Sequence, residues 1–91
     1  MKIYRSQKYR QWVARQQCLK CGFGPCQPHH EPLGENGTAE KSPDSHCVPL
    51  CPACHDFRHN IGPDTFWLEI DVKMAIIKLV TRYLSEKNDL R

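Results

Sequence analysis

Apolar residues recur at helical spacing near the start of the chain. Tyr9, Trp12 and Val13 fall on one face of a helix that this spacing predicts over about residues 7–17. Ser6 stands directly before it, and its hydroxyl makes it a suitable N-cap. The first segment is therefore predicted to be an amphipathic helix that buries an aromatic face.

A longer amphipathic pattern lies near the end of the chain, where Asp71 can cap a second helix. Its apolar positions repeat every three or four residues and form one stripe: Val72, Ile76, Leu79, Val80, Tyr83 and Leu84. Lys73, Lys78 and Arg82 are predicted to point away from that stripe. We expect the stripe to close the core over the middle of the chain, and a dimer interface is the alternative.

The middle of the chain has no helical period until about residue 52. Residues 22–49 are rich in Gly, Pro, Asn, Asp and Ser, so only short extended pieces are expected, near His29-His30 and Cys47–Leu50. Pro52 suits the first turn of a helix over about residues 52–60, which Gly62-Pro63 ends. A short helical turn follows, and its expected members are Asp64 or Thr65 as the cap, then Phe66, Trp67 and Ile70.

Two cysteine pairs, Cys18-x-x-Cys21 and Cys51-x-x-Cys54, have the spacing of zinc ligands. Two thiolates separated by two residues can reach one tetrahedral ion, and two such pairs complete a closed structural site. Disulfides are the alternative, since the chain has an even number of cysteines, 6. Zinc at such a site contributes on the order of 10 kcal/mol, which would supply the stability that a core this small lacks.

Length and composition set the fold class. The chain has 91 residues, 40% of them apolar and 25% charged, which is typical of one small globular domain. We predict a small zinc-stabilised α+β domain over residues 1–91, with a basic N-terminal helix (1–17), a zinc-stabilised core (18–60) and a C-terminal helical closure (64–87). A monomer or weak dimer is expected.

No apolar run approaches the ~20 residues that span a bilayer, and the N-terminal residues lack the apolar centre of a signal peptide. These features predict a cytoplasmic protein with no membrane partner. A reducing compartment also favours metal over disulfides for the cysteine pairs.

The histidines lie on two segments that interleave with the cysteine pairs. His55 and His59 are spaced i and i+4 on a predicted helix, so both rings can share one ion. Adjacent side chains of an extended strand point to opposite sides, so one of His29 and His30 can be a third ligand. The other is left free, as a general base for water must be.

The charge is uneven along the chain. Residues 1–30 contain no acidic residue and carry the following basic ones: Lys2, Arg5, Lys8, Arg10, Arg15 and Lys20. This asymmetry favours a polyanionic partner, nucleic acid first, with Lys8, Arg10 and Arg15 as contact candidates. A solvated helix face is the alternative reading of the same charges.

At these residues the chain resembles the HNH, or His-Me finger, endonucleases. Their ββα-metal motif has a strand that carries a metal ligand and a catalytic His, a second strand, and a helix with further ligands; the likeness covers about residues 18–60. The chain also resembles the Ref-like, RecA-dependent phage nucleases, over most of its length, at Cys18-x-x-Cys21, His29-His30, Asp44, Pro49-Leu50-Cys51 and His55-x-x-x-His59.

The resemblance implies a ββα-metal core in which His29, His55 and His59 bind a catalytic divalent metal. His30 would be the general base. The middle position of the motif, which holds the loop through backbone hydrogen bonds, is either Asp44 or His46. Mg²⁺ or Mn²⁺ would be the working ion, although three imidazoles also suit Zn²⁺ or Ni²⁺.

The resulting hypothesis is a phage- or prophage-type DNA endonuclease or nickase that uses one metal ion. Arg58, beside the ligands on the same helix, is a candidate phosphate contact, with a solvated Arg as the alternative. Two other hypotheses remain: a zinc-stabilised nucleic-acid-binding module without catalysis, and an accessory protein that acts only with a recombinase filament.

Overall fold

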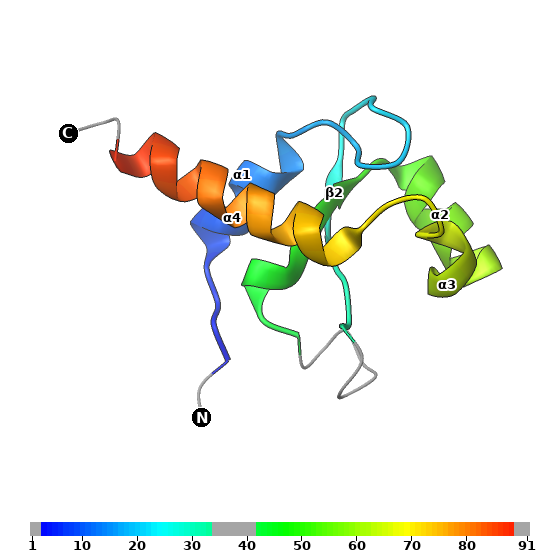
Figure 1. Cartoon of the computed structure of the whole chain (residues 1–91). Helices are drawn as coiled ribbons and strands as arrows, with labels where there is room; N and C mark the ends of the chain where they lie inside the picture. Colours follow the sequence, from blue (N-terminus) through cyan, green and yellow to red (C-terminus); the bar gives the residue numbers. More distant parts are fainter. Residues whose placement is uncertain (1–2, 34–41, 89–91) are drawn as a thin grey trace.

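A computed structural model describes residues 3–33 and 42–88 of the chain (Figure 1). Lys2 lies outside these residues. The elements follow in the order α1 (Gln7–Ala14), β1 (Gln27–His30), the 3₁₀ helix η2 (Asp44–His46), β2 (Cys47–Leu50), α2 (Pro52–Ile61), α3 (Pro63–Phe66) and α4 (Val72–Asn88). The described part is thus a small α+β fold with one two-stranded sheet, as the sequence predicts.

The two strands pair antiparallel, with His29 opposite Val48 and His30 opposite Cys47. Pro28 faces Pro49 in the same ladder. Because proline has no N–H, neither Pro28 nor Pro49 can donate a hydrogen bond across the ladder. The carbonyl oxygen of Pro49 accepts from the backbone N–H of Leu19 at 3.0 Å. That bond ties the first cysteine segment to the second strand.

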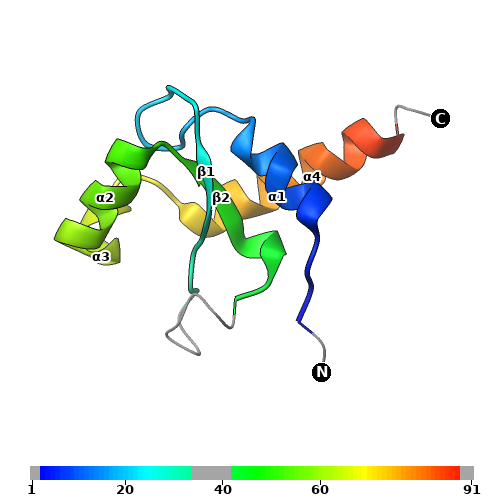
Figure 2. The ribbon, with the colours of Figure 1, turned by 180° about the vertical axis from the view of Figure 1, so that it is seen from behind.

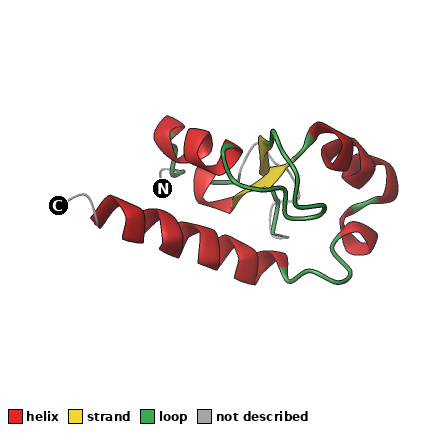
Figure 3. Ribbon diagram, turned by 90° about the horizontal axis from the view of Figure 1, so that it is seen from above, coloured by secondary structure: helices red, strands yellow, loops and turns green. Residues whose placement is uncertain are grey.

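The hairpin lies between α1 and α4, which cover it from two sides (Figure 3). Both helices contact β2, while α2 and α3 lie together at one end of the molecule (Figure 2). The core between them is apolar and aromatic: Tyr9, Trp12, Val13, Val48, Leu50, Phe66, Ile76 and Leu79 are all buried. Rings from α1 and α4 also meet, and Tyr9 and Tyr83 lie edge to face with centroids 5.0 Å apart.

The first and last helices form largely as predicted. The hydroxyl of Ser6 accepts from the backbone N–H of Tyr9 at 3.1 Å, and the carboxylate of Asp71 accepts from that of Met74 at 3.0 Å. The first helix ends at Ala14, three residues earlier than predicted. The prediction that Leu84 belongs to the buried C-terminal stripe is wrong, since this residue is 52% exposed.

The second helix begins at Pro52, with Cys51 as its N-cap, and ends at Ile61; its C-cap is Gly62, whose φ of 85° favours glycine. The next helical turn begins at Pro63 without a side-chain cap, so capping by Asp64 or Thr65 is wrong. Proline pre-sets the helical φ and needs no N–H partner in a first turn, and this replaces the cap.

No helix in residues 3–33 and 42–88 is long and apolar enough to cross a membrane. The division of the chain into segments 1–17, 18–60 and 64–87 stays a prediction.

Candidate functional site

The four cysteines of the two pairs converge. The sulfur atoms of Cys18, Cys21, Cys51 and Cys54 all lie within 4.8 Å of one another, and those of Cys21 and Cys51 are 3.7 Å apart. All six cysteines of the chain are free thiols, so the disulfide alternative finds no support here. The cluster joins the turn after α1 to the start of α2, and it could hold a structural metal such as zinc.

Backbone N–H groups surround the first of these thiols. Burial raises the pKa of Cys18, but the N–H groups of Cys21, Cys51 and Lys20 outweigh it and lower the pKa to about 6. Burial and the neighbouring thiols raise the pKa of Cys54 far above its ordinary value. Four thiols at these distances cannot all ionise without a cation, whereas zinc binds the thiolate form. The chemistry of this donor set therefore fits zinc.

The three predicted ligand histidines form a second cluster, between β1 and α2. The ring centroids of His29 and His55 are 4.8 Å apart, those of His55 and His59 are 5.0 Å apart, and those of His29 and His59 are 6.3 Å apart. Nδ1 of His29 lies 3.1 Å from Nε2 of His55. His29 is buried and His59 exposed, so the cluster opens to solvent along α2.

Oxygen atoms hold the outer nitrogens of two of these rings. Nε2 of His29 lies 3.0 Å from Oε1 of Glu31, and Nδ1 of His55 lies 2.9 Å from Oε1 of Gln27. A carboxylate can only accept, so Nε2 of His29 carries a proton, and in the neutral ring Nδ1 then has the lone pair. When the outer nitrogens of both neutral rings carry the protons, the lone pairs of Nδ1 of His29 and Nε2 of His55 face each other at 3.1 Å, an arrangement that a shared cation stabilises.

Glu31 is the centre of a buried network. Arg58 donates to it through Nε at 2.9 Å and Nη2 at 2.8 Å, and the indole N–H of Trp67 donates at 2.9 Å. Burial alone would raise the pKa of Glu31, but the bonds from His29, Arg58 and Trp67 lower it to about 2. The carboxylate is thus ionised and fixed, and through it α2 and α3 orient the ring of His29.

This network corrects the expectation for Arg58. Its side chain is neither solvated nor free for a phosphate, because the residue is only 7% exposed and its guanidinium is bound to Glu31. Burial of a charged pair is costly unless both partners are fully hydrogen-bonded, and this pair meets that condition. Of the other basic candidates, Lys8 and Arg15 are exposed, whereas Arg10 forms an ion pair with Asp44.

The fourth histidine lies in a different cluster. Nε2 of His30 lies 2.7 Å from Oδ1 of Asp44, which is fully buried and also accepts from Arg5, Arg10 and the backbone N–H of Ser6, the last at 2.6 Å. Burial would raise the pKa of Asp44, but the bonds from His30 and its other donors lower it to about 2. Asp44 rather than His46 is thus the partner of His30.

Two groups in the described part of the chain bring three or more ligand atoms within 4.8 Å of one another: the four cysteines, and His30, Asp44 and Cys47. His29, His55 and His59 are adjacent but not that tightly gathered. The cationic side chains already bound to Asp44 make the second group a poor metal site. Because His29 and His30 point to opposite sides of β1, the predicted base belongs to a separate cluster from the predicted ligands.

Sequence reasoning missed Gln27, Glu31 and Trp67. A signal for the first two was present, because residues i and i+2 of a strand share a face, and Gln27, His29 and Glu31 alternate in this way. No sequence signal places Trp67 against Glu31, since residues 36 apart meet only through the fold.

A model of the family described as "Protein of unknown function (DUF968)" matches residues 1–71. The chain belongs to this family. It is also 33% identical over 79 residues to the uncharacterized protein YdfU of Escherichia coli (strain K12). That alignment covers 86% of the chain but 22% of YdfU, so the chain spans about a fifth of the length of this relative. No solved structure matches the chain.

Proposed function

We propose that this DUF968 protein is a metal-dependent DNA endonuclease or nickase of the HNH class, with a ββα-metal core formed by β1, β2 and α2. One observation carries the proposal: Nδ1 of His29 and Nε2 of His55 face each other at 3.1 Å, while oxygen atoms of Glu31 and Gln27 hold their outer nitrogens. Outer hydrogen bonds of this kind orient metal-binding histidines in many proteins.

The donor set suits a divalent ion. Burial, together with the neighbouring His29 and His59, lowers the pKa of His55, which keeps its ring neutral and its lone pair available. His59 is exposed beside it and would complete the set from the next helical turn. A bound divalent ion would supply charge stabilisation for the phosphate and for the departing 3′-oxygen.

His30 would be the general base. Its Nε2–H donates to Asp44, whose low pKa keeps the carboxylate ionised, and Nδ1 is left to take a proton from water. The water oxygen would attack phosphorus as the bond to the 3′-oxygen breaks, leaving a 5′-phosphate and a 3′-hydroxyl. Asp44 would stabilise the imidazolium that forms, as the carboxylate does in an Asp–His pair. The exposed cations Lys8 and Arg15 would hold the DNA backbone without reading its sequence.

The test is a nicking assay on supercoiled plasmid with Mg²⁺, Mn²⁺, Zn²⁺ or Ni²⁺, with and without a recombinase filament. We expect His30→Ala to lower the rate by about 10²- to 10⁴-fold. His46→Ala is the matched control, because within the described part of the chain the ring of His30, and not that of His46, is hydrogen-bonded to Asp44. EDTA must stop all variants. Full activity of His30→Ala would remove the base assignment, and activity only with the filament would make the protein a recombinase-dependent accessory.

A non-catalytic binding module is the second candidate, and one observation favours it. Asp44 is already bound by Arg5, Arg10 and Ser6, an arrangement that attaches the N-terminal segment to η2 whether or not His30 acts as a base. Metal analysis separates the two functions. The module requires one zinc per chain, at the cysteines, whereas the endonuclease requires a second ion that His55→Ala abolishes.

A further inference from the structure

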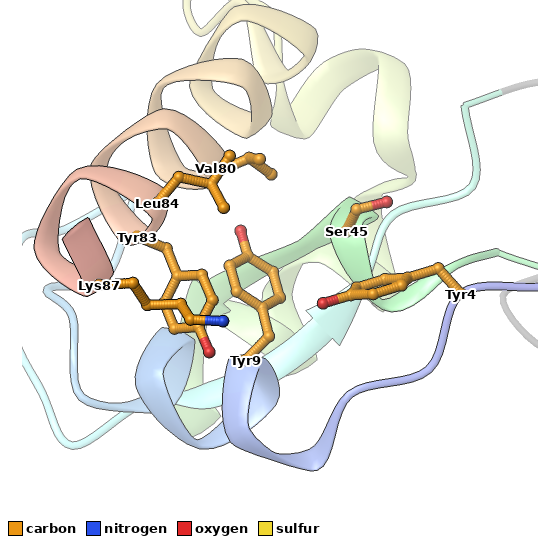
Figure 4. Close-up of a pocket in the computed structure, with 7 residues that line it drawn as sticks. All are labelled: Tyr4, Tyr9, Ser45, Val80, Tyr83, Leu84 and Lys87. Atoms are coloured by element: carbon orange, nitrogen blue, oxygen red, sulfur yellow. The ribbon is translucent and has the colours of Figure 1, made fainter.

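A cavity of about 300 Å³ lies between α1, η2 and α4 (Figure 4). All 3 tyrosines of the chain, Tyr4, Tyr9 and Tyr83, line it. Val80 and Leu84 of α4 add an apolar wall. The cavity is separate from both the cysteine cluster and the histidine cluster, and neither candidate function uses it.

The hydroxyl of Tyr9 is the unexplained group of this cavity. Tyr9 is only 2% exposed, and its hydroxyl has no hydrogen-bond partner among the residues that the structure describes. In Figure 4 it points away from α1, into the space bordered by Val80 and Ser45. Burial raises the pKa of Tyr9 to about 12, so the group stays a neutral donor. A buried donor without a partner is unfavourable, and a ligand with an acceptor would satisfy it.

The other residues that line the cavity indicate the chemistry of its ligand. Aromatic rings and aliphatic side chains favour a flat, largely apolar body, and the volume suits one ring system of nucleobase size. Lys87 lies at the rim, with its Nζ 5.8 Å from the centroid of the Tyr83 ring, where it can meet a negative charge. A base attached to a phosphate combines these features: a π-face, ring acceptors and an anion.

The cavity is next to the cluster of His30. Ser45, which lines it, directly follows Asp44 in η2, and the backbone carbonyl of Tyr4 accepts from the N–H of Asp44 at 2.9 Å. The segment before α1 has basic residues and no acidic ones. A strand whose phosphate lay near His30 could therefore place a neighbouring base in the cavity.

We propose that the cavity between α1, η2 and α4 binds one unstacked base of single-stranded nucleic acid, with the Tyr9 hydroxyl donating to the base and Lys87 near its phosphate. The proposal rests on the proposed function for the choice of nucleic acid, and it specifies a single-stranded substrate. Base stacking on aromatic side chains is the usual source of affinity for unpaired strands.

The test measures binding without cleavage, in the His55→Ala background, by fluorescence anisotropy of a labelled oligothymidylate. We expect the single strand to bind about tenfold more tightly than the same sequence in a duplex. Tyr9→Phe, which removes only the hydroxyl oxygen, should weaken single-strand binding about fivefold. Lys87→Ala should weaken it further than Lys78→Ala, the matched control on the same helix.

An oligonucleotide of abasic sites has no base to accept from the Tyr9 hydroxyl. It should therefore bind the parent weakly, and Tyr9→Phe should not change its affinity. Equal affinity of parent and Tyr9→Phe for oligothymidylate would overturn the proposal, because the cavity would then hold only solvent. Tight binding of free thymidine monophosphate without strand preference would overturn it in favour of a free nucleotide. Binding is measured in His55→Ala, which lacks one of the three proposed metal-binding histidines. The result for the base site is therefore independent of whether the parent protein cleaves DNA.

Discussion

Replacing Glu31 with Gln tests the network that orients His29. The change keeps the size of the side chain but removes the charge that faces the buried guanidinium of Arg58. Breaking a buried ion pair by removing one partner costs about 3–5 kcal/mol, because the remaining charge loses its compensation. The pKa of Glu31 gives a similar magnitude, since its fall from 4.5 to about 2 corresponds to about 3 kcal/mol.

The assay is urea unfolding of the zinc-loaded protein, followed by far-UV circular dichroism and by tryptophan fluorescence, to which both Trp12 and Trp67 contribute. We expect the free energy of unfolding to fall by about 3–5 kcal/mol in Glu31→Gln. Adding Arg58→Met should restore part of this loss, because the orphaned cation is removed. Trp67→Phe removes one hydrogen bond and part of a buried ring, so it should cost about 1–3 kcal/mol.

The same variants have a second readout in the affinity of the histidine cluster for a divalent ion. Without a carboxylate on its Nε2, His29 is less firmly held, and we expect Glu31→Gln to weaken binding of the second ion by about 10- to 100-fold. The affinity of the four cysteines for zinc should be the same in Glu31→Gln as in the parent. The reasoning is refuted if Glu31→Gln unfolds at the parent's urea midpoint, or if the double variant is no more stable than the single one.

Three further predictions follow from the geometry. The lowered pKa values of Glu31 and Asp44 stabilise the fold fully above about pH 4.5, and this contribution is lost as the pH falls toward about 2. The free energy of unfolding of Glu31→Gln, measured by urea unfolding at a series of pH values, should therefore depend less on pH in that window than that of the parent. Removing zinc with a chelator, or one ligand by Cys54→Ser, should unfold the chain, with a loss on the order of 10 kcal/mol; a chelated protein with the circular dichroism of the parent would contradict this. Tyr9→Phe should raise the free energy of unfolding by about 1 kcal/mol in the absence of nucleic acid, because it removes an unpaired buried hydroxyl, and a decrease in thermal midpoint would argue against an orphaned donor.

The local structure could largely be read from the sequence. Capping by Ser6 and Asp71, the stop at Gly62 and the two short strands depend on a few adjacent residues, whose preferences are set by backbone sterics and nearby hydrogen bonds. The convergence of the cysteine pairs was also predictable, because the spacing within each pair already orients two thiols toward one point.

Tertiary structure alone decided which charged groups are paired and which are exposed. Arginine is usually a surface residue. Arg58 is buried because it pairs with Glu31, which follows β1, and lies next to Trp67, which follows α3. Strand alternation already predicts that His29 and His30 point to opposite sides, but only the fold shows that His30 meets Asp44. Contacts between residues dozens of positions apart depend on how whole elements pack, and that information is not contained in any local spacing of residue types.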